Sequence, residues 1–276
     1  MNREQLIKNI ERTNAMLERN GPGRDFLSQP GIETIHIPGV KGYMTQFNSE
    51  AANHVGLAEM SEADADATIE RVVDFFKNQK KSFSWIVGPS SKPQDLRERL
   101  KRHRFVLNEN VSEYGLAMGT DNSINVKNDS FEIEEVTLED LEREIDMMAE
   151  AFGMGMDTSM AQYMVNLGKM INSTEYYRGQ IRAFMAVEKS TGKKVGFSIM
   201  EMDRKGGYAI LDGAAVIQEF RGKGIYKKMI EKRREVAKGE GIEYLITHAV
   251  KKTSAPVCER VGFRRICDLD IYDFKI

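Results

Sequence analysis

The sequence predicts an α/β protein of the α+β type, in which helices flank a mixed, mostly antiparallel sheet. Its composition, 41% hydrophobic and 30% charged, is typical of a soluble globular chain rather than a disordered or fibrous one. Stretches with helical period and capping residues alternate along the chain with short apolar runs typical of strands. In the second half, three such runs follow one another with glycine turns between them, which predicts antiparallel hairpins.

The first half predicts helices and strands in alternation. Leu6, Ile10 and Leu17 indicate an amphipathic helix ending at residues 20–22, too highly charged for a signal peptide. Ser61 is the expected N-cap of a helix with acidic first turns. The expected elements are the helix 1–20, the extended runs 33–39 and 42–47, the helix 61–81, the strand 82–89 and the helix 91–105.

Residues 119–130 are polar, rich in Asn, Asp and Ser, and lie between two strand-like runs, which is typical of a linker. A chain of 276 residues is long enough for two domains, so we expect one over 1–118 and another over 131–276. The second contains the expected strand 131–136, a helix 137–152 with a capping box, a methionine-rich helix within 153–170, the strands 181–189, 194–203 and 207–217, a basic helix after residue 224, the strand 243–250, the helix 254–261 and the strand 266–274.

Composition and charge exclude several classes of function. The net charge of −2 argues against a nucleic-acid or membrane-surface partner, and no apolar run approaches the roughly 20 residues that span a bilayer. The two cysteines form no CxxC pair and the four histidines show no paired ligand spacing, so we expect reduced thiols and no metal site. We therefore expect a cytoplasmic protein.

The most informative stretch is the glycine loop at 221–224, which reads Arg-Gly-Lys-Gly and lies between an apolar strand and a basic helix. The first amides of a helix lack internal partners, and glycines let an anion approach them closely. The loop is not a P-loop, because Ile217 stands where its first glycine is required. It is not a dinucleotide fingerprint either, because Lys227 replaces the third glycine. The alternative is a plain turn between strand and helix.

Residues 221–226 match the Arg/Gln-x-x-Gly-x-Gly/Ala signature of the GCN5-related N-acetyltransferases, the GNAT family. Residues 254–263 resemble the family's Ala-x-x-Leu-Tyr-x-x-x-Gly-Phe segment, and the resemblance covers about 131–274. It implies a GNAT-like fold with acetyl-coenzyme A as acyl donor. In the family the loop grips the donor's pyrophosphate, so the resemblance implies a cofactor-binding role for Arg221, Gly222, Lys223, Gly224, Ile225 and Tyr226. Lys223, Lys227 and Lys228 add positive charge nearby, unless they only form a solvated helix face.

The resemblance also implies direct acetyl transfer to a primary amine of a small molecule or peptide within a ternary complex. Backbone amides at Ala215, Val216 and Ile217 would then line the pantetheine and polarise the thioester carbonyl. Two positions depart from the family pattern. Tyr226 replaces the last Gly or Ala of the loop, and Cys258 occupies the place of a tyrosine that protonates the leaving thiolate in many members.

Asp212 is the leading candidate for the general base, with Glu201 as second choice. Strand alternation would put Asp212 and Val216 on one face, where apolar neighbours would raise the carboxylate pKa. The alternative is a hydrogen-bonded structural aspartate. Cys258 could serve as general acid, although an apolar helix cysteine is more often part of the packing. His248 is more readily explained as a satisfied core histidine than as a substrate contact.

The first half shows the family's late order of strand, helix and aromatic residue, but nothing in it matches the glycine loop. We therefore expect two GNAT-like domains in tandem, the first degenerate and without its own cofactor; a distinct small α/β cap domain is the alternative. The methionine-rich stretch 147–170 predicts either an adaptable lining for the acceptor or ordinary core packing. The rival to the enzyme is a non-catalytic acyl-coenzyme A-binding or sensing protein, and a weaker one is transfer from a longer thioester.

Overall fold

The computed structural model describes residues 1–17, 31–126, 128–153, 157–173 and 178–276. Its residues pack into two compact units. The first unit comprises Met1–Leu116, His248–Glu259 and Arg264–Ile276, and the second unit comprises Ala117–Thr247 and Arg260–Phe263. The break at residue 116 lies beside the expected boundary at 118, but most of 248–276 packs with the first unit instead of the second. The sequence of a terminal strand does not indicate which sheet the strand joins. The two expected domains, 1–118 and 131–276, stay a prediction.

The first unit is a helix-flanked sheet with strand order β1-β2-β3-β4-β13-β6. Its strands are β1 (Ile32–Thr34), β2 (Lys41–Thr45), β3 (His54–Gly56), β4 (Phe83–Val87), β5 (Val106–Leu107), β6 (Glu113–Gly119) and β13 (Arg264–Phe274). Its helices are α1 (Arg3–Thr13), the 3-10 helix η1 (Asn14–Met16), α2 (Ala65–Asn78), α3 (Leu96–Arg102) and α8 (Ser254–Arg260). β13 joins this sheet by antiparallel pairing with β4, whereas β3 and β4 run parallel. Phe76, Phe83 and Trp85 are fully buried in its core.

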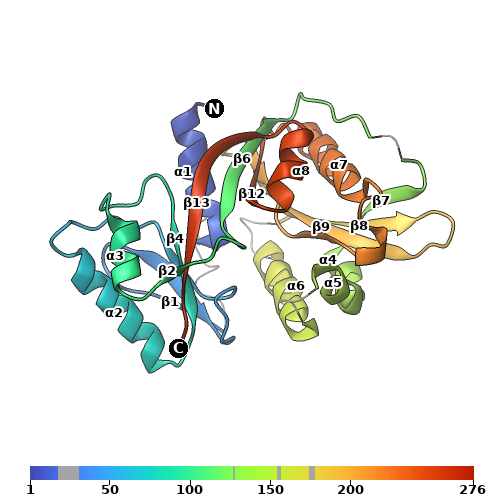
Figure 1. Ribbon diagram of the computed structural model, residues 1–276. Helices are drawn as coiled ribbons and strands as arrows, with labels where there is room; N and C mark the ends of the chain where they lie inside the picture. The colour runs from blue at the N-terminus through green and yellow to red at the C-terminus, as the bar shows by residue number, and fades with distance from the viewer. Residues whose placement is uncertain (18–30, 127, 154–156, 174–177) are drawn as a thin grey trace. The chain divides into compact units, whose positions relative to one another are not determined.

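The second unit is a sheet of order β12-β10-β9-β8-β7, with α7 on one face and α4, α5 and α6 on the other (Figure 1). Its strands are β7 (Phe131–Val136), β8 (Ile181–Glu188), β9 (Lys194–Asp203), β10 (Tyr208–Ile210), β11 (Ala214–Val216) and β12 (Tyr244–Val250). Its helices are α4 (Leu138–Glu142), α5 (Ile145–Phe152), α6 (Thr158–Ser173), the 3-10 helix η2 (Gln218–Phe220) and α7 (Ile225–Gly239). All pairs in this sheet are antiparallel except β10 with β12. The mixed, mostly antiparallel sheet expected from the sequence is confirmed.

The expected strand 207–217 is interrupted by a one-residue bulge. Ile210 pairs with Glu201 of β9, whereas Ala214 pairs with Ser198, so three residues between these pairs on one strand oppose two on the other. Gly213 has a φ of 36° at this point, and the Ile199 amide reaches both the Asp212 and the Gly213 carbonyl oxygens. The shift divides the strand into β10 and β11 and moves the following side chains to the opposite face.

The two halves of the chain repeat the same strand–helix–strand arrangement with equal connections. β3 leads through residues 57–64 to α2, and β11 leads through 217–224 to α7. Residues 79–82 then lead to β4, as residues 240–243 lead to β12. In each half a seven-residue helix follows, and a buried phenylalanine lies three residues beyond it. The residue before each phenylalanine has a positive φ, 70° at Arg104 and 111° at Gly262.

The predicted helices differ from the observed ones mainly at their ends. α1 ends at Thr13, earlier than expected, and the predicted end at 20–22 lies outside the described residues. α2 begins at Ala65 with Asp64 as its N-cap, so Ser61, whose hydroxyl accepts the Asp64 amide, lies three residues too early to cap it. Thr137 and Asp140 do form the predicted capping box. Among the described residues, no helix is long and apolar enough to cross a membrane.

Candidate functional site

The glycine loop connects β11 to α7 and leaves backbone amides directed out of the start of the helix. Gly222 and Gly224 have φ values of 78° and 80°, and a Cβ on either would meet no atom within 4 Å. The first helical hydrogen bond runs from the Lys228 amide to the Gly224 carbonyl, at 3.1 Å. The amides of residues 225–227 therefore precede the helical ladder, where the helix dipole favours an anion. The loop thus has both the open space and the donors that a phosphate group requires.

The backbone of β11 presents its groups alternately to β9 and away from it. The Ile217 amide donates to the Val195 carbonyl, and the Ile199 amide donates to the Gly213 carbonyl, each at 2.9 Å. By strand alternation, the groups of Ala215 also face β9, while those of Ala214 and Val216 face the other way. Of the three amides predicted to line a ligand, those of Ala215 and Ile217 therefore face β9 within the sheet, and that of Val216 faces away from it.

The outward edge of β11 is not paired with β12 in the described part of the chain. β10 and β12 run parallel up to Ile210 and Ile246, and the Leu211 amide closes the ladder by donating to the Ile246 carbonyl at 2.8 Å. The Thr247 hydroxyl donates a hydrogen bond to the Leu211 carbonyl oxygen at 3.0 Å. The bulge after Leu211 turns β11 away, so the chain that follows pairs with β9 alone. The separation of the two parallel strands at the bulge leaves an unpaired strand edge beside the glycine loop. This arrangement suits an extended ligand with a phosphate at one end.

Residues 157–263 match the family model described as the acetyltransferase (GNAT) family. These residues are similar to members of that family. They include β11, the glycine loop, α7 and β12, which are the elements of the candidate site. A comparison of the sequence with curated proteins gives no significant match.

Solved GNAT structures share the fold along most of the chain. A GCN5-related N-acetyltransferase from Kribbella flavida is similar with a TM-score of 0.63 and 12% identity, over 88% of this chain and 89% of that chain. Another from Sphaerobacter thermophilus has a TM-score of 0.65 and 12% identity, over 86% of this chain and 76% of that chain. A tandem GNAT protein from the clavulanic acid biosynthesis pathway has a TM-score of 0.59 and 10% identity, over 99% of this chain and 94% of that chain. Identities this low show the fold alone.

Arg221 of the GNAT signature holds the loop in place. Its Nε donates to the Val216 carbonyl and its Nη2 to the Ala151 carbonyl at the end of α5, each at 2.9 Å. The guanidinium therefore ties the loop to β11 and to α5. Two of its donor groups thus support the shape of the loop, a role that the signature alone does not indicate.

The lysines beside the GNAT loop have different surroundings. The Lys223 ammonium lies 4.5 Å from the centroid of the Phe220 ring, a cation–π distance. The Lys228 ammonium donates to the carbonyl oxygens of Asn128 and Phe131, each at 2.6 Å. The Lys228 side chain is therefore bound to the main chain that precedes and begins β7, which differs from the alternative of a solvated helix face. Ile225 is buried and Tyr226 is half-buried, so the tyrosine that replaces the small residue is partly packed away from solvent.

The catalytic candidates lie in different places. Asp212 is half-buried in the bulge, so the argument that strand alternation puts it on the face of Val216 was wrong. Glu201 lies on β9 opposite Ile210 and is buried, with 7% of its surface exposed. Cys258 lies in α8, and 1% of its surface is exposed. It belongs to the first unit, whereas Asp212 and Glu201 belong to the second. The packing interpretation of Cys258 agrees with that burial.

Two further predictions concern residues outside the glycine loop. His248 Nε2 lies 2.9 Å from the Ile10 carbonyl, so the expectation of a satisfied structural histidine is confirmed. The methionine-rich stretch forms the end of α5 and, as expected, a second helix, α6; residues 154–156 lie outside the described residues. Met147 and Met148, the first two residues of that stretch, are buried in the core, as the packing alternative expects. No group of three or more His, Cys, Asp or Glu side chains among the described residues could hold a metal ion.

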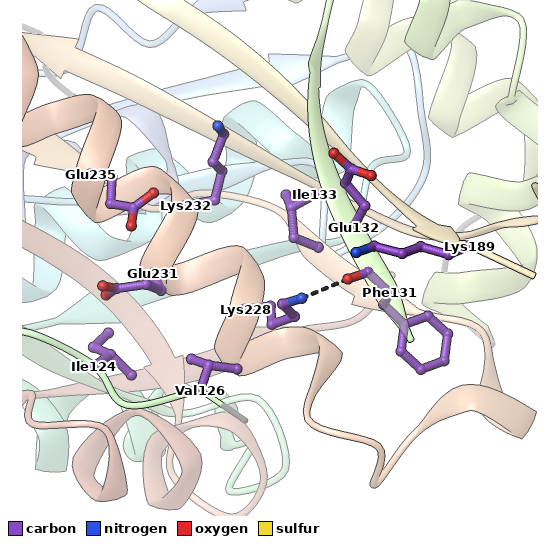
Figure 2. Close-up of a pocket in the computed structure, with 10 residues that line it drawn as sticks. All are labelled: Ile124, Val126, Phe131, Glu132, Ile133, Lys189, Lys228, Glu231, Lys232 and Glu235. Carbon is purple, nitrogen blue, oxygen red and sulfur yellow. Dashed lines mark hydrogen bonds between the residues drawn. The ribbon is translucent and has the colours of Figure 1, made fainter. Parts of the chain in front are cut away.

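A groove of about 440 Å³ between α7 and β7 lies close to the GNAT loop and has no counterpart in the sequence predictions. Figure 2 shows charged side chains of both signs around it, with apolar residues between them. The lining residues are Ile124, Val126, Phe131, Glu132, Ile133, Lys189, Lys228, Glu231, Lys232 and Glu235. The mixed charges favour neither an anionic nor a cationic ligand.

Proposed function

We propose that the protein is an N-acetyltransferase that moves an acetyl group from acetyl-coenzyme A to a primary amine of a small molecule or peptide. The observation that carries this proposal is the glycine loop at the start of α7, continuous with a strand edge that points away from the sheet. An anionic end and an amide-bearing chain are the two features of acetyl-coenzyme A that such a site suits. The family match of residues 157–263 supports the same conclusion.

The residues of the chain have separate tasks in this proposal. The amides of 222–226 bind the pyrophosphate, and Arg221 keeps the loop in shape. The outward amides of Ala214 and Val216, in place of those of Ala215 and Ile217, pair with the pantetheine and polarise the thioester carbonyl, as preorganised donors do for a developing oxyanion. The bound donor supplies an activated acyl group, and holding it beside the amine replaces a bimolecular encounter by a positioned reaction.

An ammonium group must lose a proton before it can attack, and we assign this task to Asp212. The carboxylate lies in the bulge that separates β10 from β11, two residues before the first outward amide of β11. The amine attacks the thioester carbonyl directly, without an acyl-enzyme, and the C–S bond breaks to release coenzyme A as a thiolate, which takes a proton from water. The base and the carbonyl donors lie on one short segment of backbone. We retain Cys258 as a residue of the packing and not as the general acid.

The first half of the chain is proposed to be a GNAT-like domain without its own cofactor. Residues 57–64, which correspond in length and position to 217–224, contain no glycine and carry Glu59, Glu62 and Asp64. Acidic side chains before a helix would repel a pyrophosphate. Likeness of fold to a tandem GNAT protein over 99% of this chain supports the duplication.

The test is a calorimetric titration with acetyl-coenzyme A, followed by a thiol-release assay with a panel of amines. We expect one site per chain, with binding abolished by Gly224→Glu, and release of free thiol that depends on an amine. Binding without amine-dependent release would favour the rival function, a non-catalytic acyl-coenzyme A sensor. No binding at millimolar ligand would refute both and leave the loop as a simple turn.

A further inference from the structure

The segment that enters β7 is tied to the glycine loop and to α7 by three hydrogen bonds. Asn128 Nδ2 donates to the Lys223 carbonyl at 2.6 Å, although the two residues are 95 positions apart in the sequence. Lys228 Nζ donates to the carbonyl oxygens of Asn128 and Phe131, each at 2.6 Å. Figure 2 shows the second of these bonds, from α7 to the first residue of β7. Asn128 thus connects the loop with the helix that follows it.

The bond to the Lys223 carbonyl determines where the Gly224 amide points. The two groups belong to one peptide unit, and in a trans peptide the C=O and N–H point in opposite directions. Gly224 has no Cβ and tolerates most backbone conformations, so this peptide would rotate readily without a restraint. A rotated peptide would present a carbonyl oxygen to an anion in place of an N–H. With the oxygen held by Asn128, the N–H faces the side opposite to Asn128.

The side chain of Asn128 is itself fixed on both of its polar atoms. Its Oδ1 accepts the Ser130 amide at 2.9 Å, which leaves Nδ2 as the group that faces the loop. The Lys228 ammonium holds its main-chain carbonyl. Asn128 therefore gives the loop a rigidly held donor. Lys228 stabilises this arrangement through its hydrogen bond to the Asn128 carbonyl oxygen.

We propose that Asn128 is a positioning residue of the anion-binding loop, holding the Lys223–Gly224 peptide with its N–H toward the bound pyrophosphate. The inference rests on the proposed function, because it assumes that a pyrophosphate binds at this loop. Asn128 acts through the Gly224 amide and makes no contact with the ligand. Its removal weakens the pyrophosphate end of the donor and leaves the thioester end, at β11, unchanged.

The sharpest variant is Asn128→Asp, which keeps the oxygen that accepts the Ser130 amide but loses the donor to Lys223. Asn125→Asp is the matched control, since Asn125 is exposed, lies three residues earlier and receives the same charge. We expect Asn128→Asp to raise the Kd of acetyl-coenzyme A about tenfold, the usual effect of losing one hydrogen bond and leaving its acceptor facing another. Asn125→Asp should change it less than twofold. Asn128→Ala, which adds no charge, should raise it about threefold to tenfold.

The same titrations with S-acetylpantetheine, which lacks the pyrophosphate, separate positioning from general damage to the domain. We expect Asn128→Asp and the unchanged protein to bind it within a factor of two. The inference is overturned if Asn128→Asp binds acetyl-coenzyme A like the unchanged protein, or if Asn128→Ala does so and the loss is due to charge alone. It is also overturned if both ligands lose affinity by the same factor. Failure of the unchanged protein to bind acetyl-coenzyme A would instead refute the proposed function.

Discussion

Replacing Gly224 by alanine separates the two demands that the glycine meets, backbone conformation and ligand access. Gly224 has a φ of 80°, where an L-residue with a side chain is strained by roughly 1–2 kcal/mol. A Cβ there would meet nothing within 4 Å, so no steric clash adds to that cost. The smaller conformational freedom of alanine in the unfolded chain returns roughly 0.4–1 kcal/mol. The expected net loss of stability is therefore about 1 kcal/mol, or a fall in Tm of about 2–4 °C.

Gly192 is the matched control, because it has a φ of 71° in the turn between β8 and β9 and also has nothing within 4 Å of a Cβ. Gly192→Ala and Gly224→Ala should therefore lower Tm alike, as measured by thermal melting. Only Gly224→Ala places a methyl group where an anion would approach the loop amides. We expect its Kd for acetyl-coenzyme A to rise about tenfold, equivalent to about 1.4 kcal/mol, and that of Gly192→Ala to stay unchanged. Equal affinities for the two variants in calorimetry would refute the reasoning.

Two predictions concern the chemistry. Asp212→Asn should lower kcat about a hundredfold at neutral pH, as loss of a general base does, with the calorimetric Kd of acetyl-coenzyme A unchanged; turnover equal to that of the unchanged protein across the pH range would remove Asp212 from the mechanism. Cys258→Ala should cost about 1 kcal/mol of stability, since the side chain is 1% exposed, and should leave kcat unchanged at every pH; a fall in kcat at low and neutral pH that disappears at high pH, where a thiol ionises, would show instead that Cys258 donates a proton.

The sequence predicts the site best where function depends on backbone conformation. Glycines at 222 and 224 before a basic helix identify the loop, because few residues other than glycine adopt a φ near 80°. The strand that precedes the loop is predicted less well. Residues 207–217 have the composition of one continuous strand, and a bulge of one residue leaves no mark except Gly213. The prediction that Asp212 and Val216 share a face was wrong for this reason.

Other features depend on contacts between distant parts of the chain, which one sequence does not encode in any local pattern. Asn128 lies in a stretch whose composition predicts only a linker, and its bond to Lys223 spans 95 residues. Arg221 matches a family signature, but its two bonds to carbonyl oxygens follow from the packing of α5 against β11. The same holds for β13, whose partner β4 lies almost two hundred residues earlier, as the Phe83–Phe274 pair shows.

The equal connections in the two halves bear on what the glycines are for. Residues 57–64 lead from a strand into a helix in as many steps as residues 217–224, and they do so without a glycine. In that stretch only Leu57, with a φ of 48°, departs from ordinary backbone angles, among the residues that the structure describes there. A strand-to-helix connection of this length can therefore be built without glycine. The two glycines at 222 and 224 therefore exceed what the path of the chain requires, and the proposed ligand accounts for them.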